Sequence, residues 1–198
     1  MKVLVACEFS GTVRRAFAAL GHYVVSCDLL PADDGAKWPD HRQHDVRQLL
    51  NGPWDLMIAH PPCTHLAVSG ARWFPNKQAE QGAALEFIRE LMDAPIERIC
   101  IENPISVIST KIRKPDQIVQ PHHFGDPSFK ATCLWLKNLP PLEWTNPLPI
   151  PLRGTPEWTA WNKVHRMPPS PTRGKERSRF PEGIARAMAE QWGGNKSV

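Results

Sequence analysis

The first half of the chain alternates short apolar runs with longer amphipathic stretches, a pattern typical of βαβ units. Helical periodicity marks residues 12–20, which Gly21 terminates, and residues 77–94. Apolar runs bounded by polar or turn residues predict buried strands at 2–7, 23–27, 55–59 and 97–101. Because strands alternate with helices, we expect an α/β fold with a mostly parallel sheet and helices on both faces.

The pattern changes at about residue 137, where proline and tryptophan become frequent. The prolines exclude long helices and the tryptophans argue against plain disorder, so we expect an ordered, irregular arm over residues 137–180. An amphipathic helix follows at 181–193, with Pro181 in its first turn. Because 198 residues are enough for one domain with a full core, we expect a single domain (1–198) whose α/β core spans 1–136.

Net charge and cysteine usage bear on the possible partners of the chain and on its cellular compartment. The net charge of +4 and the isoelectric point near 8.9 permit a nucleic acid as a partner without requiring one. Basic side chains concentrate in residues 173–186, where they either contact phosphates or form a solvated surface. Five cysteines without a C-x-x-C pair favour reduced thiols in a cytoplasm. We expect no signal peptide and no membrane span, because the apolar runs are short.

Several histidines lie in predicted loops, where a metal site is the first possibility to consider. No cysteine or carboxylate cluster accompanies them at the spacing that zinc and other transition metals require. We therefore interpret these histidines as polar loop residues and predict no metal site; they are His60, His65, His122 and His123.

The predicted strand ends carry the residues of chemical interest. In doubly wound sheets, ligands bind beyond the carboxyl ends of the strands. Gly11 follows the first strand in the stretch EFSG, and Asp28 ends the second strand, where an acidic residue meets ribose hydroxyls in such folds. Without a full G-x-G-x-x-G pattern, Gly11 is equally well a tight turn. Asp28 has the alternative of a helix cap or a surface turn residue.

Cys63 and Glu102 follow two later strands. Pro61 and Pro62 remove two backbone donors and fix two φ angles, so the strand stops at His60 and Cys63 lies on a rigid loop. Such a thiol is either a packing residue or a nucleophile. Glu102 follows the apolar run RICI, where a carboxyl group either forms a structural salt bridge or donates and shares a proton. The two residues on adjacent strand ends favour catalysis.

Three motifs in this order resemble the cytosine carbon-5 DNA methyltransferases, which use S-adenosylmethionine. ACEFSG is similar to their first cofactor loop, HPPCT to their Pro-Cys nucleophile loop and IENP to their Glu-Asn element. The resemblance covers roughly residues 1–136, and residues 179–192 (RFPEGIARAMAEQW) resemble the ends of small phage-type methylases. It implies a Rossmann-like S-adenosylmethionine-dependent methyltransferase fold and a phage, prophage or restriction-modification setting.

The resemblance also implies roles for the cofactor loops. Phe9 would face the adenine, and Gly11 would let the backbone approach the methionine part. Asp28 would hold the ribose, and Asp45 would reach the adenine amino group. The expected cofactor-binding residues are therefore Phe9, Ser10, Gly11, Asp28, Asp45 and Pro61.

On the substrate side, the resemblance implies that Cys63 attacks cytosine carbon 6, which makes carbon 5 nucleophilic enough to take the methyl group. Glu102 would bond the ring nitrogen and the exocyclic amine and stabilise the charge that develops there. The base would have to be out of the stack for a loop cysteine to reach it. Expected substrate-binding residues are Asn103, Lys130, Thr132, Arg173, Arg177 and Arg179.

The chain departs from the family in three ways. Glu8, the acidic residue of the cofactor loop, is shifted by one position, and the glycines that follow in the family are missing. The arginine-rich strand is replaced by GDPSFKATCLWL, where only Lys130 and Thr132 can substitute for the arginines. A separate target-recognition domain is replaced by the Pro/Trp-rich arm.

These departures leave three functions open. In the first, the chain is a DNA methylase with a short or relaxed sequence preference, and its arm and basic tail contact the phosphates of duplex or single-stranded DNA. Alternatively, it methylates a free cytosine nucleotide, or it is a non-catalytic module that binds nucleic acid or a protein. Retention of Cys63 and Glu102 argues against the third function. The oligomeric state and the target sequence do not follow from the sequence.

Overall fold

The sheet has seven strands in the order β3-β2-β1-β4-β5-β7-β6. The structure is a computed structural model that describes residues 1–194. Its strands are β1 (Lys2–Ala6), β2 (Tyr23–Asp28), β3 (His41–Gln43), β4 (Leu56–Ala59), β5 (Arg98–Pro104), β6 (Gln117–Val119) and β7 (Thr132–Lys137). The prediction of a mostly parallel sheet is confirmed, because β1 to β5 pair in parallel and only β6 and β7 run antiparallel to their neighbours.

This strand order is that of the Rossmann-like methyltransferase fold. It reverses between β1 and β4, the position where ligands bind in doubly wound sheets. The carboxyl ends of β1, β2, β4 and β5 therefore meet at one edge of the sheet, and each of them leads into a loop or strand end that the sequence marks as chemically interesting.

Helices cover both faces of the sheet, as the alternation of strands and helices predicts. They are α1 (Thr12–Ala19), α2 (Gln78–Met92), α3 (Ile108–Lys111), α4 (Pro156–Trp161), α5 (Lys163–Arg166), α6 (Arg173–Ser178) and α7 (Glu182–Gly193), with 3-10 turns η1 (Val46–Leu49), η2 (Val68–Asn76) and η3 (Pro121–His123). Among the residues 1–194, no helix has the length and apolar character needed to cross a bilayer.

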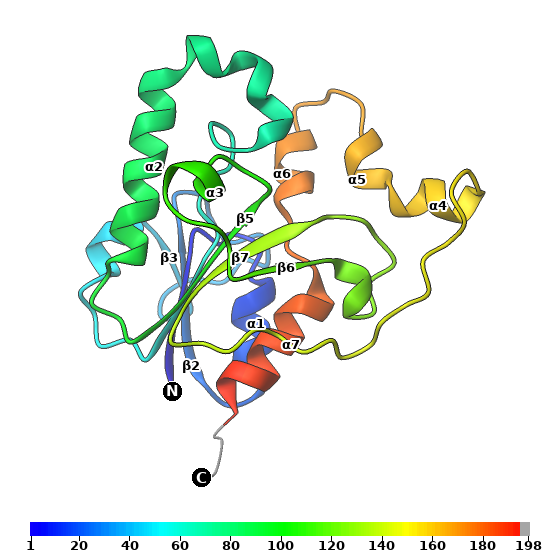
Figure 1. Cartoon of the computed structure of the whole chain (residues 1–198). Helices are drawn as coiled ribbons and strands as arrows, with labels where there is room; N and C mark the ends of the chain where they lie inside the picture. The colour runs from blue at the N-terminus through cyan, green and yellow to red at the C-terminus, as the bar shows by residue number, and fades with distance from the viewer. Residues whose placement is uncertain (195–198) are drawn as a thin grey trace.

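Two apolar cores form, one on each face of the sheet. Phe17 of α1 and Met188 of α7 pack with Ile58 of β4 on one face, and Ile88 of α2 packs with Met57 of β4 on the other. Figure 1 shows α1 and α7 side by side, away from α2. Small buried side chains along α7 let this helix approach α1 closely; they are Ala185, Ala187 and Ala189.

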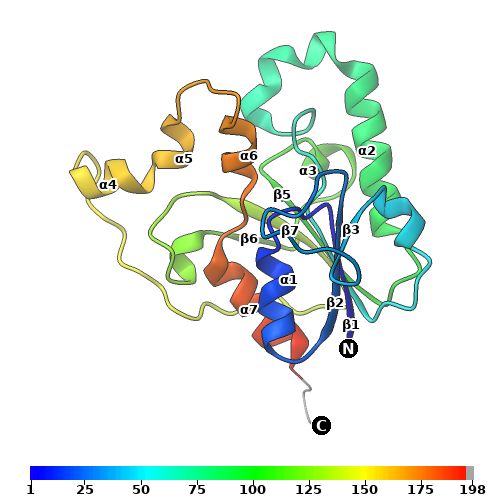
Figure 2. The same cartoon turned by 180° about the vertical axis from the view of Figure 1, so that it is seen from behind.

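The arm after β7 is ordered and contains only short helices, as its prolines require. Thr155 caps α4 by accepting the Trp158 amide at 3.1 Å, and Pro156 occupies the first turn. Phe129 and Trp161 pack with ring centroids 5.2 Å apart and fasten the arm to the loop before β7. Figure 2 shows α4 and α5 on the side of the molecule away from α2.

The structure adds one short strand and shifts one helix boundary. Residues 41–43 form β3, which no apolar run predicts, because three residues are too few to show a strand period. β5 continues past the apolar run through Pro104, where β7 pairs with Glu102 and Asn103. α7 begins at Glu182, and Pro181 is its N-cap rather than part of its first turn.

The close contact at the start of α7 generates a stability prediction. A Cβ atom on Gly183 would lie 2.2 Å from the carbonyl oxygen of Phe124, so Gly183→Ala forces the backbone apart. We expect it to lower the free energy of unfolding by about 1–3 kcal/mol. Gly82 lies on the exposed face of α2, where an added Cβ atom would meet no other atom within 4 Å. Gly82→Ala should therefore raise the free energy of unfolding by about 0.5–1 kcal/mol.

Urea unfolding of the two variants and the parent checks this prediction. Equal stability of Gly183→Ala and the parent would show that α7 does not dock this closely on the loop at Phe124.

Candidate active site

The loop after β1 turns sharply to bring an acidic side chain under α1. Cys7 has φ 57°, a left-handed conformation that is strained for a residue with a side chain. The carboxylate of Glu8 is buried and accepts the amides of Val13 at 2.6 Å and Arg14 at 3.2 Å. A carboxylate at a helix N-terminus satisfies free amides and complements the helix dipole. Glu8 therefore anchors α1.

Gly11 begins α1 in the left-handed region, with φ 68°. A Cβ atom on Gly11 would lie 2.7 Å from an Asp34 carboxylate oxygen. Asp34 forms ion pairs with Arg14 and, at 2.8 Å, with Arg15, and this pairing holds the pKa of its carboxyl group below the usual value. The space above Gly11 is therefore a glycine-sized cradle, filled by mobile charged side chains rather than by backbone.

Two carboxylates converge beside Cys7. Asp28 accepts the Leu30 amide at 2.8 Å, and burial raises the pKa of its carboxyl group. Asp45 caps η1 by accepting the Arg47 amide at 3.0 Å, which lowers the pKa of that carboxyl group. Burial, followed by the charge of Asp28, raises the pKa of the Cys7 thiol. The strand ends of β1 and β2 and the start of η1 therefore form one acidic wall.

A basic segment crosses this wall. We call residues 172–180, which include α6, the strap. Lys175 Nζ lies 2.5 Å from Asp33 Oδ1, and Arg179 pairs with Asp33 Oδ2 at 3.0 Å. Lys175 also lies 5.4 Å from the ring centre of Phe9, whose carbonyl accepts the Asp33 amide. The strap therefore covers the first cofactor loop predicted from the sequence.

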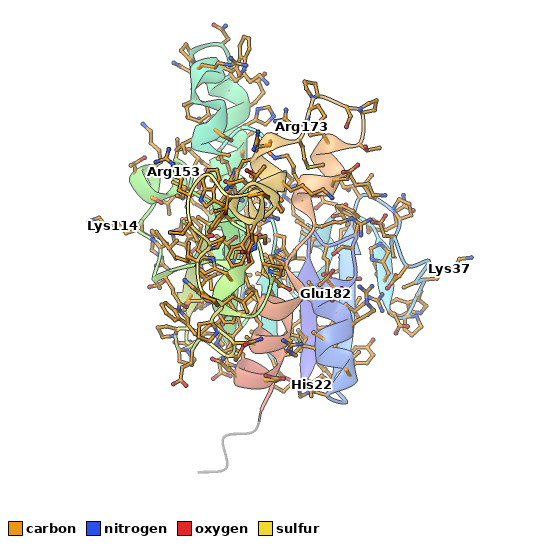
Figure 3. All side chains as sticks on the ribbon, turned by 90° about the vertical axis from the view of Figure 1, so that its right-hand side faces the viewer. His22, Lys37, Lys114, Arg153, Arg173 and Glu182 are labelled. Atoms are coloured by element: carbon orange, nitrogen blue, oxygen red, sulfur yellow. The ribbon has the colours of Figure 1, made fainter. Side chains whose placement is uncertain are left out.

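The same strap reaches the later strand ends. Lys130 Nζ donates to the carbonyl oxygen of Arg179 at 2.7 Å, and the ring of Phe180 packs 4.6 Å from that of His60. Figure 3 shows Arg173, at the start of α6, and His22, which precedes β2, at opposite ends of the molecule. The strap is thus placed at the carboxyl edge of the sheet, where it joins the two halves of the site.

Cys63 lies on a loop that is held from several sides. The Asn103 side-chain amide donates to the carbonyl oxygen of Pro61 at 2.9 Å. The Val68 amide donates to Ile105 at 3.1 Å, immediately after β5. These bonds, together with the two fixed prolines, tie the loop of Cys63 to the end of β5, so the loop keeps a defined position beside Glu102.

Charges around Cys63 show which groups face it. Burial raises the pKa of the Cys63 thiol, and the negative charge of Glu102 raises it further. Lys130 and Arg177 oppose this effect with positive charge. Burial also lowers the pKa of the Lys130 amine, with Glu102 acting in the opposite direction. The charges of one carboxyl group and two basic groups therefore all act on the Cys63 thiol.

Glu102 has a partner that sequence reasoning interpreted only as a loop residue. His60 Nδ1 lies 3.0 Å from Glu102 Oε2, and each side chain is 11% exposed. Asp33 was likewise not predicted as part of the site. Both roles depend on long-range pairing, that of His60 on the register of β4 with β5 and that of Asp33 on the strap. His60 opens the HPPCT motif, but nothing in that motif indicates that it pairs with Glu102.

The remaining predicted substrate residues, and Ser10 from the predicted cofactor residues, differ in how exposed they are and in what they contact. Thr132 is buried in β7, and its hydroxyl donates to the Lys130 carbonyl oxygen at 3.2 Å. Ser10 is buried, and its hydroxyl lies 3.1 Å from that of Thr12, within the turn before α1. Arg173 begins α6, and Arg179 is paired with Asp33.

Two further features concern cavities and metals. Two open hollows of about 580 Å³ each lie at the amino end of the sheet, lined in part by Met1, His22 and Trp192. They are remote from the carboxyl ends of the strands, where the reactive side chains lie. The candidate site is therefore located by its side chains and not by the size of a hollow. Within residues 1–194, no three histidine, cysteine or carboxylate side chains are grouped as metal ligands.

No protein-family model and no curated protein matches the chain. A solved structure with a similar fold is that of an E. coli prophage-encoded protein described as a candidate DNA modification methyltransferase. Sequence identity is 18% and the TM-score is 0.44; the match covers 69% of this chain and 46% of the prophage protein. The likeness is one of fold, and residue roles do not transfer from it.

The charges around Cys63 predict its reactivity. Glu102→Gln removes a negative charge, so the pKa of Cys63 falls and the thiolate fraction rises. Lys130→Gln removes a positive charge and has the opposite effect. We expect alkylation of Cys63 by iodoacetamide near pH 8 to be roughly three- to tenfold faster in Glu102→Gln and slower in Lys130→Gln.

Peptide mapping by mass spectrometry gives the rate at Cys63 separately from the other thiols. The matched control is Glu86→Gln on the exposed face of α2, which should leave the rate unchanged. Equal rates in all variants would contradict the clustering of these charges around the thiol.

Proposed function

We propose that the chain transfers a methyl group from S-adenosylmethionine to carbon 5 of cytosine in DNA, through a covalent bond between Cys63 and carbon 6. The observation that carries this proposal is the register of β4 with β5, which brings the loop of Cys63, bonded to Asn103 at 2.9 Å, beside Glu102 at the carboxyl edge of the sheet. The charges of Glu102 and Lys130 both act on the Cys63 thiol there. A nucleophile beside an acid and a cation is the arrangement that an addition to an electron-poor ring requires.

In this mechanism Cys63 supplies the electron pair. The thiol proton leaves to water, and the thiolate bonds to carbon 6, which shifts electron density to carbon 5, a poor nucleophile in the free base. Glu102, in its protonated form, donates its proton to the ring nitrogen and accepts from the exocyclic amine, so the negative charge that develops on the ring is stabilised. The methyl group passes to carbon 5 and S-adenosylhomocysteine leaves; water then takes the proton of carbon 5, and the electron pair of that C–H bond restores the ring double bond as the bond to Cys63 breaks. Because the resting thiol is held protonated by burial, its activation depends on the neighbouring basic groups.

The residues at the ends of β1 and β2 fit the cofactor. Phe9 offers an aromatic face, Asp28 a carboxylate suited to a ribose diol and Asp45 an acceptor for an amine. The cradle at Gly11 would be filled by a Cβ atom, and the side chains that occupy it are the flexible ends of Arg14 and Asp34. The bound cofactor would supply an electrophilic methyl group, and Pro61 on the nucleophile loop would adjoin it.

The charge distribution favours a polymer over a free nucleotide. Residues 151–180 contain seven lysines and arginines against two glutamates, so this segment carries more positive charge than the +4 of the whole chain. Such a concentration beside the site suits a row of phosphates, which Arg173 and Arg177 would contact. A nucleotide would need one or two of these charges and not the entire arm.

The first test concerns cofactor binding. Asp28→Ala should weaken the binding of S-adenosylhomocysteine by about 1.5–3 kcal/mol, because it removes hydrogen bonds between a carboxylate and the ribose. Isothermal calorimetry measures the affinity, and Asp93→Ala at the exposed end of α2 serves as the control. If the parent protein binds no S-adenosylhomocysteine, with or without nucleic acid, the methyltransferase proposal is wrong.

The second test traps the covalent step. Fluorine at cytosine carbon 5 cannot leave as a proton does, so the protein should remain bonded to a fluorocytosine substrate in the presence of S-adenosylmethionine. We expect an adduct that survives denaturation, is lost in Cys63→Ser and forms about a hundredfold more slowly in Glu102→Gln. Intact-protein mass spectrometry measures it.

The substrate that traps the protein separates the alternatives. Fluorocytosine is offered in duplex DNA, in single strands and as the free nucleotide. If only the free nucleotide forms an adduct, the substrate is a cytosine nucleotide and not DNA. If the protein binds the cofactor but forms no adduct with any of the three substrates, it is a non-catalytic module and does not methylate cytosine by the covalent route.

A further inference from the structure

The register of the sheet brings His60 and Glu102 together. β4 and β5 are parallel, with Ala59 opposite Ile101, so His60 and Glu102 are the next opposed pair. Side chains alternate between the faces of a strand. Ile58 and Cys100 belong to the core beneath α1 and α7, so His60 and Glu102 emerge on that same face, directly after the last apolar layer.

The pair is enclosed rather than exposed. Nδ1 of His60 lies 3.0 Å from Oε2 of Glu102, and Phe180 covers the imidazole ring. Within residues 1–194, this contact is the one hydrogen bond that the Glu102 side chain makes. A buried carboxyl group with a single fixed partner has one defined orientation, and its second oxygen remains available.

The chemistry of the contact sets the proton position. Whether Glu102 is ionised or carries its proton on Oε1, its Oε2 atom can only accept, so Nδ1 of His60 carries the proton and donates it. Nε2 of His60 is then buried without a partner among the described residues. An unpaired buried polar atom costs about 1–3 kcal/mol, so its retention calls for a role that offsets that cost.

We propose that His60 is the positioning residue of the site: its Nδ1–H holds Oε2 of Glu102 and turns the carboxyl group so that Oε1 faces the target base. This inference rests on the proposed methyl transfer for its substrate, whereas the His60–Glu102 contact stands on the geometry alone. His60 acts through Glu102 and does not touch the base. The pair also connects the strap, through Phe180, to the orientation of the acid.

The first measurement compares two substitutions of His60. His60→Phe fills the space beneath Phe180 but removes the donor, so we expect adduct formation with fluorocytosine DNA to slow by about a hundredfold. His60→Asn retains an amide donor near the position of Nδ1, so the rate should return to within about tenfold of the parent. DNA affinity, measured by fluorescence anisotropy, should stay within about threefold in both variants, because the carboxyl group acts on the reacting ring.

The matched control is His22→Phe, which replaces another partly buried histidine beside an aromatic ring, Phe17, at the opposite end of the molecule. It should form the adduct at the parental rate. A parental rate in His60→Phe, or equal rates in His60→Phe and His60→Asn, would overturn the proposal.

A second measurement does not depend on activity. Long-range ¹H–¹⁵N correlation spectra of protein labelled at histidine report which ring nitrogen carries the proton. We expect the signals of His60, identified by their loss in His60→Asn, to show a protonated Nδ1 and to change in Glu102→Gln, while those of His22 do not. An unprotonated Nδ1, or signals that ignore Glu102→Gln, would refute the pairing even if no substrate is found. If the parent protein forms no adduct but the spectra are as expected, the proposed reaction is wrong and the His60–Glu102 contact still stands.

Discussion

The site depends on the parallel pairing of β4 with β5. This register sets the strand ends level, so the loop that carries Cys63 and the acid at Glu102 emerge side by side. The side-chain amide of Asn103 donates to the carbonyl oxygen of Pro61, which fixes the loop of Cys63 relative to the end of β5. A slip of one residue would send Glu102 to the opposite face of the sheet and separate it from the thiol. The two apolar cores that fix the register therefore also fix the chemistry.

Local patterns were sufficient to predict most of the sheet and the positions of the chemically interesting residues. Apolar runs such as those before Asp28 and Glu102 predict buried strands because burial leaves a signal in consecutive residues. β3 is too short to leave such a signal, and the end of β5 is determined by its partner β7. His60 and Asp33 were missed for a related reason, since each acquires its role from a residue far away in the sequence. Their contacts follow from tertiary structure.

The strap places positive charge on two sides of the site. Its Lys175 and Arg179 neutralise Asp33, while its Arg177, together with Lys130 before β7, favours the thiolate of Cys63. A segment that satisfies both sides needs no large apolar interface to stay in place. Exposed ion pairs of this kind are individually weak and sensitive to salt. The strap is therefore held by several small contributions together with the buried ring of Phe180.

The pairing of Asp33 with Arg179 joins residues 146 positions apart, and α7, which follows the strap, covers α1 near the start of the chain. On a ribosome that adds 5–20 residues per second, the partner of Asp33 emerges about 7–30 s after Asp33 itself. During that interval the apolar face around Phe17 has no cover, and the first loop has no strap above it. The segment of β1 and α1 is thus completed by residues made much later, and a nascent chain acquires its closed site only after the strap and α7 have been made.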